Sequence, residues 1–246
     1  MSCHGVFLLP RAGWVEAMRR VVFILLLLPL PVLAGVGKVY EPYVNASEKE
    51  LEYFAVYDDG DASDPRHSLK QVIGYAFGIT EGVAAEISAS RYQISEGANE
   101  FRSSEVEVFW QLTEQGEYES DWGLAFALER NHINNYWKSA TKLLLAHDFS
   151  QTSLLLNAGI SYSWGGGVNN EYEGELRGAY VWRLSPTLSP SIEFYTSESL
   201  TALGPMMSGH YRLAPGKALN WRAGVLFGVD TYSPNNVLKF ELDYEF

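Results

Sequence analysis

The chain has 246 residues, and its 18 basic and 30 acidic side chains give a formal net charge of −12 at pH 7. This acidic balance argues against nucleic acid as a partner, because phosphate binding needs a basic face. Cys3 is the single cysteine, which excludes a disulfide framework and a thiolate metal site.

An apolar segment near the amino terminus has the features of a secretory signal. Residues 19–34 read RRVVFILLLLPLPVLA, with two arginines ahead of the apolar run and Val32 and Ala34 at the small-residue cleavage positions. Two prolines interrupt the run, which is short for a spanning helix of about 20 apolar residues. We expect a cleaved signal peptide over residues 1–34, with Met18 as its more usual start; a retained anchor helix is the alternative.

After a leader over residues 35–47, apolar and polar side chains alternate in a long series of segments. Alternation with a period of two is typical of strands, and helical periodicity is absent. Each segment is close to the length of a tilted transmembrane strand, about 9–11 residues. The expected strands cover residues 48–57, 70–78, 83–93, 103–112, 122–131, 138–147, 152–164, 171–184, 188–196, 206–213, 219–229 and 237–246.

The connections alternate in character along the chain. Those after even-numbered strands are mostly short and rich in Gly, Pro, Asp and Ser, which favours tight turns. Those after odd-numbered strands are mostly longer and more polar. Residues 113–121 break this pattern, because they form a long connection among the short ones.

The last segment, VLKFELDYEF, carries the most specific signal. Leu238, Phe240, Leu242, Tyr244 and Phe246 share one face of a strand, and charged residues fill the other. This ending resembles the carboxy-terminal strand of Gram-negative outer-membrane β-barrel proteins, in which a terminal Phe after alternating apolar residues is the assembly signal.

The resemblance implies a location and partners. Phe240, Leu242, Tyr244 and Phe246 are then the signal read by the barrel-assembly machinery, and deleting Phe246 is expected to impair assembly more than truncating a loop. The expected location is the cell outer membrane, among outer-membrane lipid and lipopolysaccharide.

The alternation and the ending together predict an all-β fold, an up-and-down antiparallel transmembrane β-barrel of about twelve strands over residues 48–246. The leader over residues 35–47 is expected in the periplasm, and odd-numbered strands are expected to run outward. Aromatic residues then form a girdle at one interface, at positions Trp110, Trp122, Trp182, Tyr211, Trp221, Tyr244 and Phe246. A soluble β-sandwich is the alternative, but it gives no reason to gather aromatic residues at one end of the strands.

Strand parity places many charges in the expected lumen. One wall is acidic: Glu50, Glu52, Glu86, Glu105, Glu107, Glu129, Glu241, Asp243 and Glu245. The other is mixed but more basic: Lys138, Lys142, Arg177, Arg183, His210, Arg212 and Arg222, interrupted by Glu173, Glu175 and Glu193. The candidate selectivity residues are Glu105, Glu107, Glu129, Arg177, Arg212 and Arg222.

Two functions remain open at this point. A field across an open pore favours a channel or porin-like transporter for small hydrophilic solutes. The same charges could instead pair and fill the lumen, as in small barrels, which favours a closed barrel with a structural or surface-binding role.

The sequence offers little support for a catalytic or cofactor-binding role. His67, His132, His147 and His210 lie in no nucleophile–base–orienter pattern, so no enzymatic activity, cofactor or metal is expected. The acidic tip formed by Asp58, Asp59, Asp61 and Asp64 lacks the spacing of a calcium loop, and a solvated loop is the simpler interpretation. Gly165, Gly166 and Gly167 indicate a flexible hairpin tip rather than a phosphate cradle.

Overall fold

The computed structural model describes residues 35–60, 66–95, 97, 100–166, 168–185, 187–197, 200–231 and 233–246. The expected signal peptide, Asp61, Asp64 and Gly167 lie outside these residues. Within them, no helix is long and apolar enough to cross a membrane.

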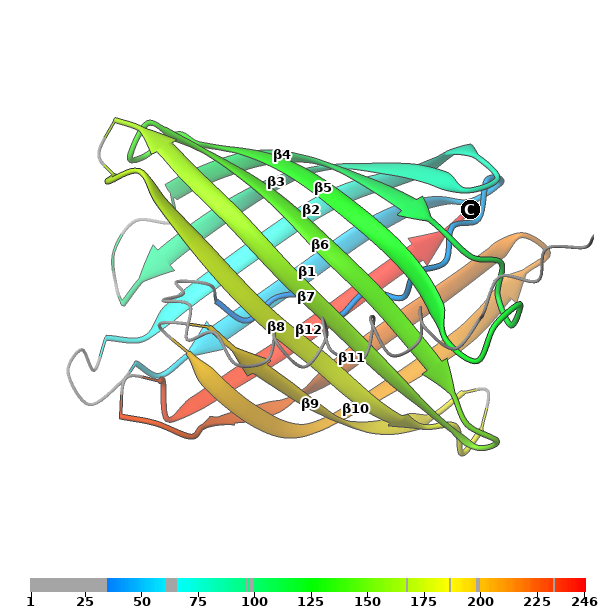
Figure 1. The fold of residues 1–246 in the computed structure, drawn as a ribbon. Helices are drawn as coiled ribbons and strands as arrows, with labels where there is room; N and C mark the ends of the chain where they lie inside the picture. The colour runs from blue at the N-terminus through cyan, green and yellow to red at the C-terminus, as the bar shows by residue number, and fades with distance from the viewer. Residues whose placement is uncertain are drawn as a thin grey trace, which may run out of the picture. The chain divides into compact units, whose positions relative to one another are not determined.

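The fold is a closed antiparallel β-barrel in which every strand pairs with its neighbours in sequence and β12 closes against β1 (Figure 1). This confirms the predicted fold class and strand number. The strands are β1 (Lys49–Asp58), β2 (Ser68–Thr80), β3 (Val83–Ile94), β4 (Glu100–Gln111), β5 (Asp121–Asn131), β6 (Tyr136–Asp148), β7 (Thr152–Gly165), β8 (Glu171–Trp182), β9 (Ser189–Thr196), β10 (Thr201–Ala214), β11 (Lys217–Gly228) and β12 (Asn236–Glu245).

The largest error in the predicted bounds is at β10, which was expected to start at residue 206 and starts at Thr201. Pro205 suggested a loop, because proline cannot donate a ladder hydrogen bond. The strand accommodates it by pairing Pro205 with Ile192 of β9, while the register toward β11 passes from Leu203 to Met206. The N–H group that proline lacks therefore falls where the ladder between β10 and β11 has no paired residue.

The connections define two ends of the barrel. We call the end where odd-numbered strands finish the loop end, and the end where β1 begins and β12 finishes the turn end. The turn end carries the tight turns at residues 81–82 and 215–216, and also the long connection at residues 112–120 that the sequence predicted. At this end the amide of Phe246 donates to the carbonyl of Lys49 over 2.9 Å, which extends the closure of the barrel.

The outer face of the barrel is apolar. Every strand exposes a large hydrophobic or aromatic side chain by 36–63%: Leu51, Ile73, Ile87, Val106, Phe126, Leu143, Ile160, Tyr180, Ile192, Leu203, Phe227 and Leu238. In water such a surface would aggregate, whereas lipid removes the cost and closure leaves no free edge. The strand parity inferred from sequence is therefore the parity of the fold.

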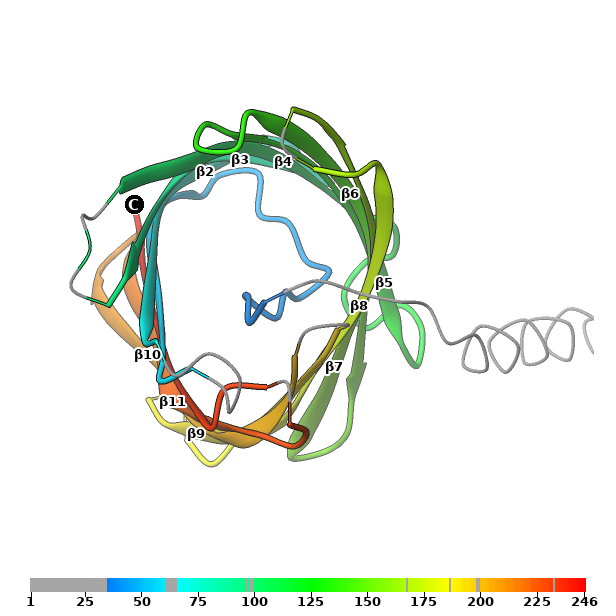
Figure 2. The ribbon, with the colours of Figure 1, turned by 90° about the vertical axis from the view of Figure 1, so that its left-hand side faces the viewer.

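The leader lies inside the barrel and not beyond its end. Figure 2 shows the segment after residue 34, in blue, running within the ring of strands. We call residues 35–48 the plug segment. The last residue of this segment lies at the turn end, where the amide of Gly78 donates to the carbonyl of Glu48 over 3.2 Å. The polar backbone of this segment finds partners on the lumen wall, a position that the sequence alone did not predict.

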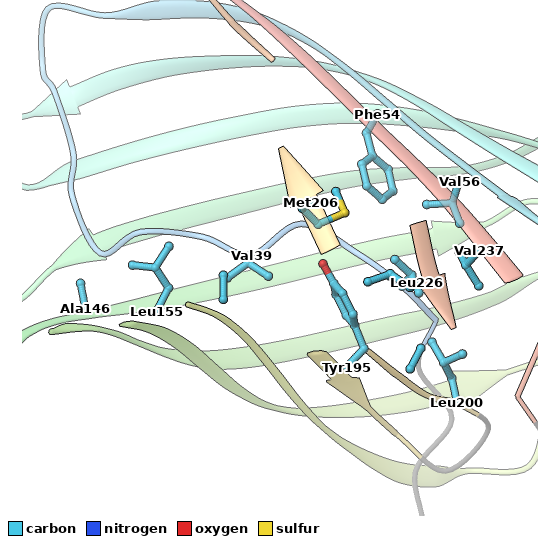
Figure 3. Packing of buried hydrophobic residues seen from close by; sticks show 13 residues of the cluster. Val39, Phe54, Val56, Ala146, Leu155, Tyr195, Leu200, Met206, Leu226 and Val237 are labelled. Atoms are coloured by element: carbon cyan, nitrogen blue, oxygen red, sulfur yellow. The ribbon is translucent and has the colours of Figure 1, made fainter. Parts of the chain in front are cut away.

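One side of the lumen is packed with apolar side chains (Figure 3). Val36 and Val39 of the plug segment contribute to this cluster, and β1 supplies Phe54 and Val56. The remaining members are Ala146, Leu155, Ala179, Tyr195, Leu200, Ala202, Met206, Leu226 and Val237. A buried side chain of this size is worth about 1.5–3 kcal/mol when removed from water. The plug segment is thus held by hydrophobic burial on the side of β6–β12 and β1.

Candidate functional site in the barrel lumen

Asn157 of β7 fixes the plug segment by holding both backbone groups of one residue. The amide of Tyr40 donates to Asn157 Oδ1 over 2.7 Å, and Asn157 Nδ2 donates to the Tyr40 carbonyl over 2.9 Å. Asn157 is 2% exposed, so these two bonds are shielded from water. The amide side chain therefore takes the place of a neighbouring strand for this part of the plug segment.

The Tyr40 side chain reaches the lumen wall at β4 and β6. Its ring lies 5.0 Å from the Phe109 ring, and the Lys142 ammonium lies 5.0 Å from its centroid. Its hydroxyl donates to Glu107 Oε2 over 3.3 Å, while Lys142 donates to Glu107 Oε1 over 2.7 Å. Tyr40 thus connects β7, through its backbone, to β4, through its side chain.

Charged side chains hold the rest of the plug segment. Arg177 donates to the Lys38 carbonyl over 3.1 Å, and Arg222 donates to the Val39 carbonyl over 3.4 Å. The Lys38 ammonium pairs with Glu52. Burial lowers the pKa of Lys38, but the carboxylates of Glu52, Glu86 and Asp243 outweigh it and raise the pKa above its usual value. Lys38 therefore stays charged across the physiological range.

A second ion network lies wholly inside the barrel wall of β9, β11 and β12. The Lys239 ammonium, fully buried, lies 2.8 Å from Glu193 and 2.7 Å from Glu241. It also donates to the Tyr195 hydroxyl over 2.6 Å. Arg222 approaches the same two carboxylates at 3.5 and 3.6 Å. Two cations thus balance two anions in a site closed to water.

Two cavities remain in the lumen. The larger, about 580 Å³, opens toward the loop end of β1 and β2 and is bordered by strands β1–β8 and the plug segment. The smaller, about 150 Å³, lies among the turn-end residues of β1–β4. Tyr40 and Glu86 line both cavities, so this side-chain pair stands between them.

The candidate selectivity residues fall into three groups. Glu105, Glu129 and Arg177 line the larger cavity. Glu107, 1% exposed, and Arg222 are held in buried ion pairs. Arg212 is exposed near the turn end of β10 and lines neither cavity.

The ion pairs also change the expected picture of two opposed charged walls. Lys38 pairs with Glu52 and Lys239 with Glu241 on the acidic side, and Lys138 pairs with Glu173 on the basic side. Lys239 has inward parity on its strand. Its pairing with Glu193 of β9 could not be predicted in the same way, because it depends on how the curvature of the barrel brings two distant strands together.

Two cations at the larger cavity were missed. Lys70 of β2 has inward parity, whereas Arg102 of β4 does not. Ser90 pairs with Ser103 and Arg91 with Phe101, so Arg102 is the extra residue of a β-bulge. A bulge re-aims a side chain, and here it turns Arg102 into the lumen, with its guanidinium 4.5 Å from the Tyr92 ring centroid.

The structure also brings together two serine–histidine pairs that sequence spacing did not show. Ser104 lies 3.0 Å from His132 Nε2, and Ser120 lies 2.8 Å from His147 Nδ1. Among the described residues, neither histidine has a carboxylate bonded to its other ring nitrogen to orient it, as a catalytic base requires. In the same residues, no group of three or more His, Cys, Asp or Glu side chains could hold a metal ion.

No protein-family model matches the chain, and no curated protein sequence matches it. Solved structures do share its fold. An outer membrane channel from Pseudomonas putida F1 aligns at a TM-score of 0.55 and 12% identity, covering 87% of this chain and 100% of that one. The NanC porin aligns at 0.55 and 11% identity, covering 80% and 98%. The KdgM porin, solved in complex with disordered oligogalacturonate, aligns at 0.50 and 12% identity, covering 80% and 98%. At these identities the likeness concerns the fold, which is that of the outer-membrane β-barrel class.

Proposed function

We propose that this chain is an outer-membrane channel for small hydrophilic solutes, gated by its own plug segment. The carrying observation is the larger cavity of about 580 Å³, which is lined by charged, serine and tyrosine side chains and reaches the loop end. The shared fold with porins and an outer membrane channel supports this proposal. In it, the loop end faces the cell exterior and the turn end faces the periplasm.

Passage through the lumen then requires the plug segment to shift. Its backbone is tied by Asn157, Arg177 and Arg222, all of them side-chain contacts that can break without unpairing a strand. The barrel wall holds itself together through its own ladders. Gating is therefore the movement of one segment within a fixed wall.

A closed barrel with a structural or surface-binding role is the second candidate. The packing of Val36 and Val39 into the apolar cluster favours it, because release of the plug segment exposes those side chains to water. Under this alternative the plug segment is a permanent part of the core.

Single-channel recording separates the two candidates. Purified, refolded protein in a planar bilayer is expected to give discrete conductance steps. Its folding is checked by the difference in gel mobility between unheated and boiled samples. Uptake of small sugars by protein-containing liposomes provides an independent measure. Sustained silence of correctly folded protein in both assays would favour the closed barrel.

A further inference from the structure

Several charged groups at the larger cavity have no ion-pair partner within the described part of the chain, and four of them lie on β2, β4 and β5. The cations are Lys70 and Arg102, and the anions are Glu105 and Glu129. Lys138 and Lys142 of the same cavity, by contrast, pair with Glu173 and Glu107. The four unmatched groups therefore mark one part of the wall, on β2, β4 and β5.

The two carboxylates are neighbours. Glu105 and Glu129 are directly opposed on β4 and β5. Opposed residues have their Cβ atoms about 4.5–5.5 Å apart, and like charges at that distance repel. Glu86, 5% exposed, adds a buried carboxylate oxygen with no hydrogen-bond donor, and it lines the same cavity. Among the described residues, none of these three carboxylates forms an ion pair.

The two cations line the same cavity, on the strands that flank β3. Lys70 pairs in register with Tyr92, and the bulge places the Arg102 guanidinium over the Tyr92 ring. Both side chains are half-buried. In the described part of the chain no ion pair joins Lys70 or Arg102 to Glu105 or Glu129, so a gap separates the cations from the anions that line the same cavity.

We propose that this gap is a binding subsite for small zwitterionic solutes of the amino acid and dipeptide class. The ammonium of the solute would lie between Glu105 and Glu129, and its carboxylate would contact Lys70 and Arg102. A guanidinium binds a carboxylate through two parallel hydrogen bonds, which gives the anionic end its orientation. The subsite deepens the proposed function by naming a solute class for the same lumen.

A solute with one charge satisfies only half of this arrangement. A simple anion leaves the opposed carboxylates unmatched, and a simple cation leaves Lys70 and Arg102 unmatched. Because a channel must also release its solute, binding is expected to be weak, of about millimolar affinity.

Calorimetric titration of the full-length, folded protein in detergent tests the subsite. The probes are diglycine, N-propionylglycine, which replaces the ammonium by a methyl group, and glycylglycinamide, which lacks the carboxylate. Diglycine should bind at least about tenfold more tightly than either analogue, because each analogue loses one charge-assisted contact. Equal affinities of the three probes, or no binding of diglycine, would overturn the proposal.

Variants locate the site. Arg102→Gln and Lys70→Gln should each weaken the binding of diglycine about tenfold and leave the binding of glycylglycinamide unchanged. Glu129→Gln should weaken the binding of diglycine and leave the binding of N-propionylglycine unchanged. Arg212→Gln, which lies outside both cavities, is the matched control and should bind as the wild type does. Wild-type affinity in both Arg102→Gln and Lys70→Gln would contradict the site. Binding is measured without current, so conductance without diglycine binding refutes the subsite alone, whereas binding without conductance refutes the channel alone.

Discussion

Removing residues 35–44, with the signal peptide joined directly to Asn45, is expected to raise single-channel conductance several-fold. The deletion removes Tyr40 from between the two cavities and leaves the strand ladders untouched. It also exposes Phe54 and Leu226 of the apolar cluster, so the thermal midpoint should fall while the barrel still forms.

A milder variant separates gating from loss of the core. Asn157→Ala removes both hydrogen bonds to Tyr40 and should weaken docking of the plug segment by about 2 kcal/mol, or about thirtyfold in the docking equilibrium. It should therefore raise the open time. Asn220→Ala, whose side chain bonds His210 and Glu245 of the wall, is the control and should gate normally. If the deletion and Asn157→Ala both conduct as the wild type does, the plug segment is not the gate.

Replacing Lys239 by Met is expected to destabilise the barrel by about 3–5 kcal/mol, because it leaves buried carboxylates without their closest cation. Glu193 and Glu241 then depend on Arg222 alone, which lies 3.5 and 3.6 Å away. The fall should appear as a lower midpoint when the loss of the compact gel form is followed against temperature or denaturant.

The matched control is Lys217→Met, which changes an exposed lysine at the turn end of β11. It should melt as the wild type does. Adding Glu193→Gln to Lys239→Met should recover part of the loss, since Arg222 then remains as the partner of Glu241. If Lys239→Met melts like Lys217→Met, the ion network does not form as described.

The barrel itself could be predicted from sequence because lipid and closure impose a simple period. Each strand shows one apolar face, and a residue such as Leu156 or Phe227 marks it without reference to any other strand. Even the long connection at residues 112–120 was visible as a break in turn length. The alternation within each strand is therefore enough to predict the barrel.

The lumen could be predicted only in part. Glu105 and Glu129 were correctly placed on its surface by parity, but Arg102 was not, because a bulge has no reliable single-strand signature. The plug segment has no period at all, so its position depends on contacts such as that between Tyr40 and Asn157. Leu155 sits among serines and asparagines of β7 and looked like an exception, yet it belongs to the apolar cluster.

The buried pairs also divide the candidate selectivity residues into groups with different expected behaviour. Glu105 faces the cavity, so its neutralisation should change ion preference. Glu107 and Arg222 are tied to Lys142 and Glu241, so their neutralisation should mainly lower stability. Sequence parity alone could not make this distinction, because it assigns all three to the same lumen.

The most direct test of a plug segment that gates the lumen is a reversible covalent lock. A Cβ on Gly123 of β5 would lie 3.0 Å from the Pro42 Cβ, and disulfides join Cβ atoms about 3.5–4.5 Å apart, so Pro42→Cys with Gly123→Cys needs only a small adjustment. Cys3 lies in the segment expected to be cleaved, which leaves no competing thiol.

Single-channel recording of this double variant, before and after reduction, is the decisive measurement, with disulfide formation verified by loss of maleimide labelling. The account predicts that the oxidised protein opens far less often than the wild type, and that reduction restores wild-type steps in the same preparation. Two thiols that stay free under oxidising conditions would contradict the position of the plug segment. An oxidised protein that conducts as the wild type does would contradict its role as the gate.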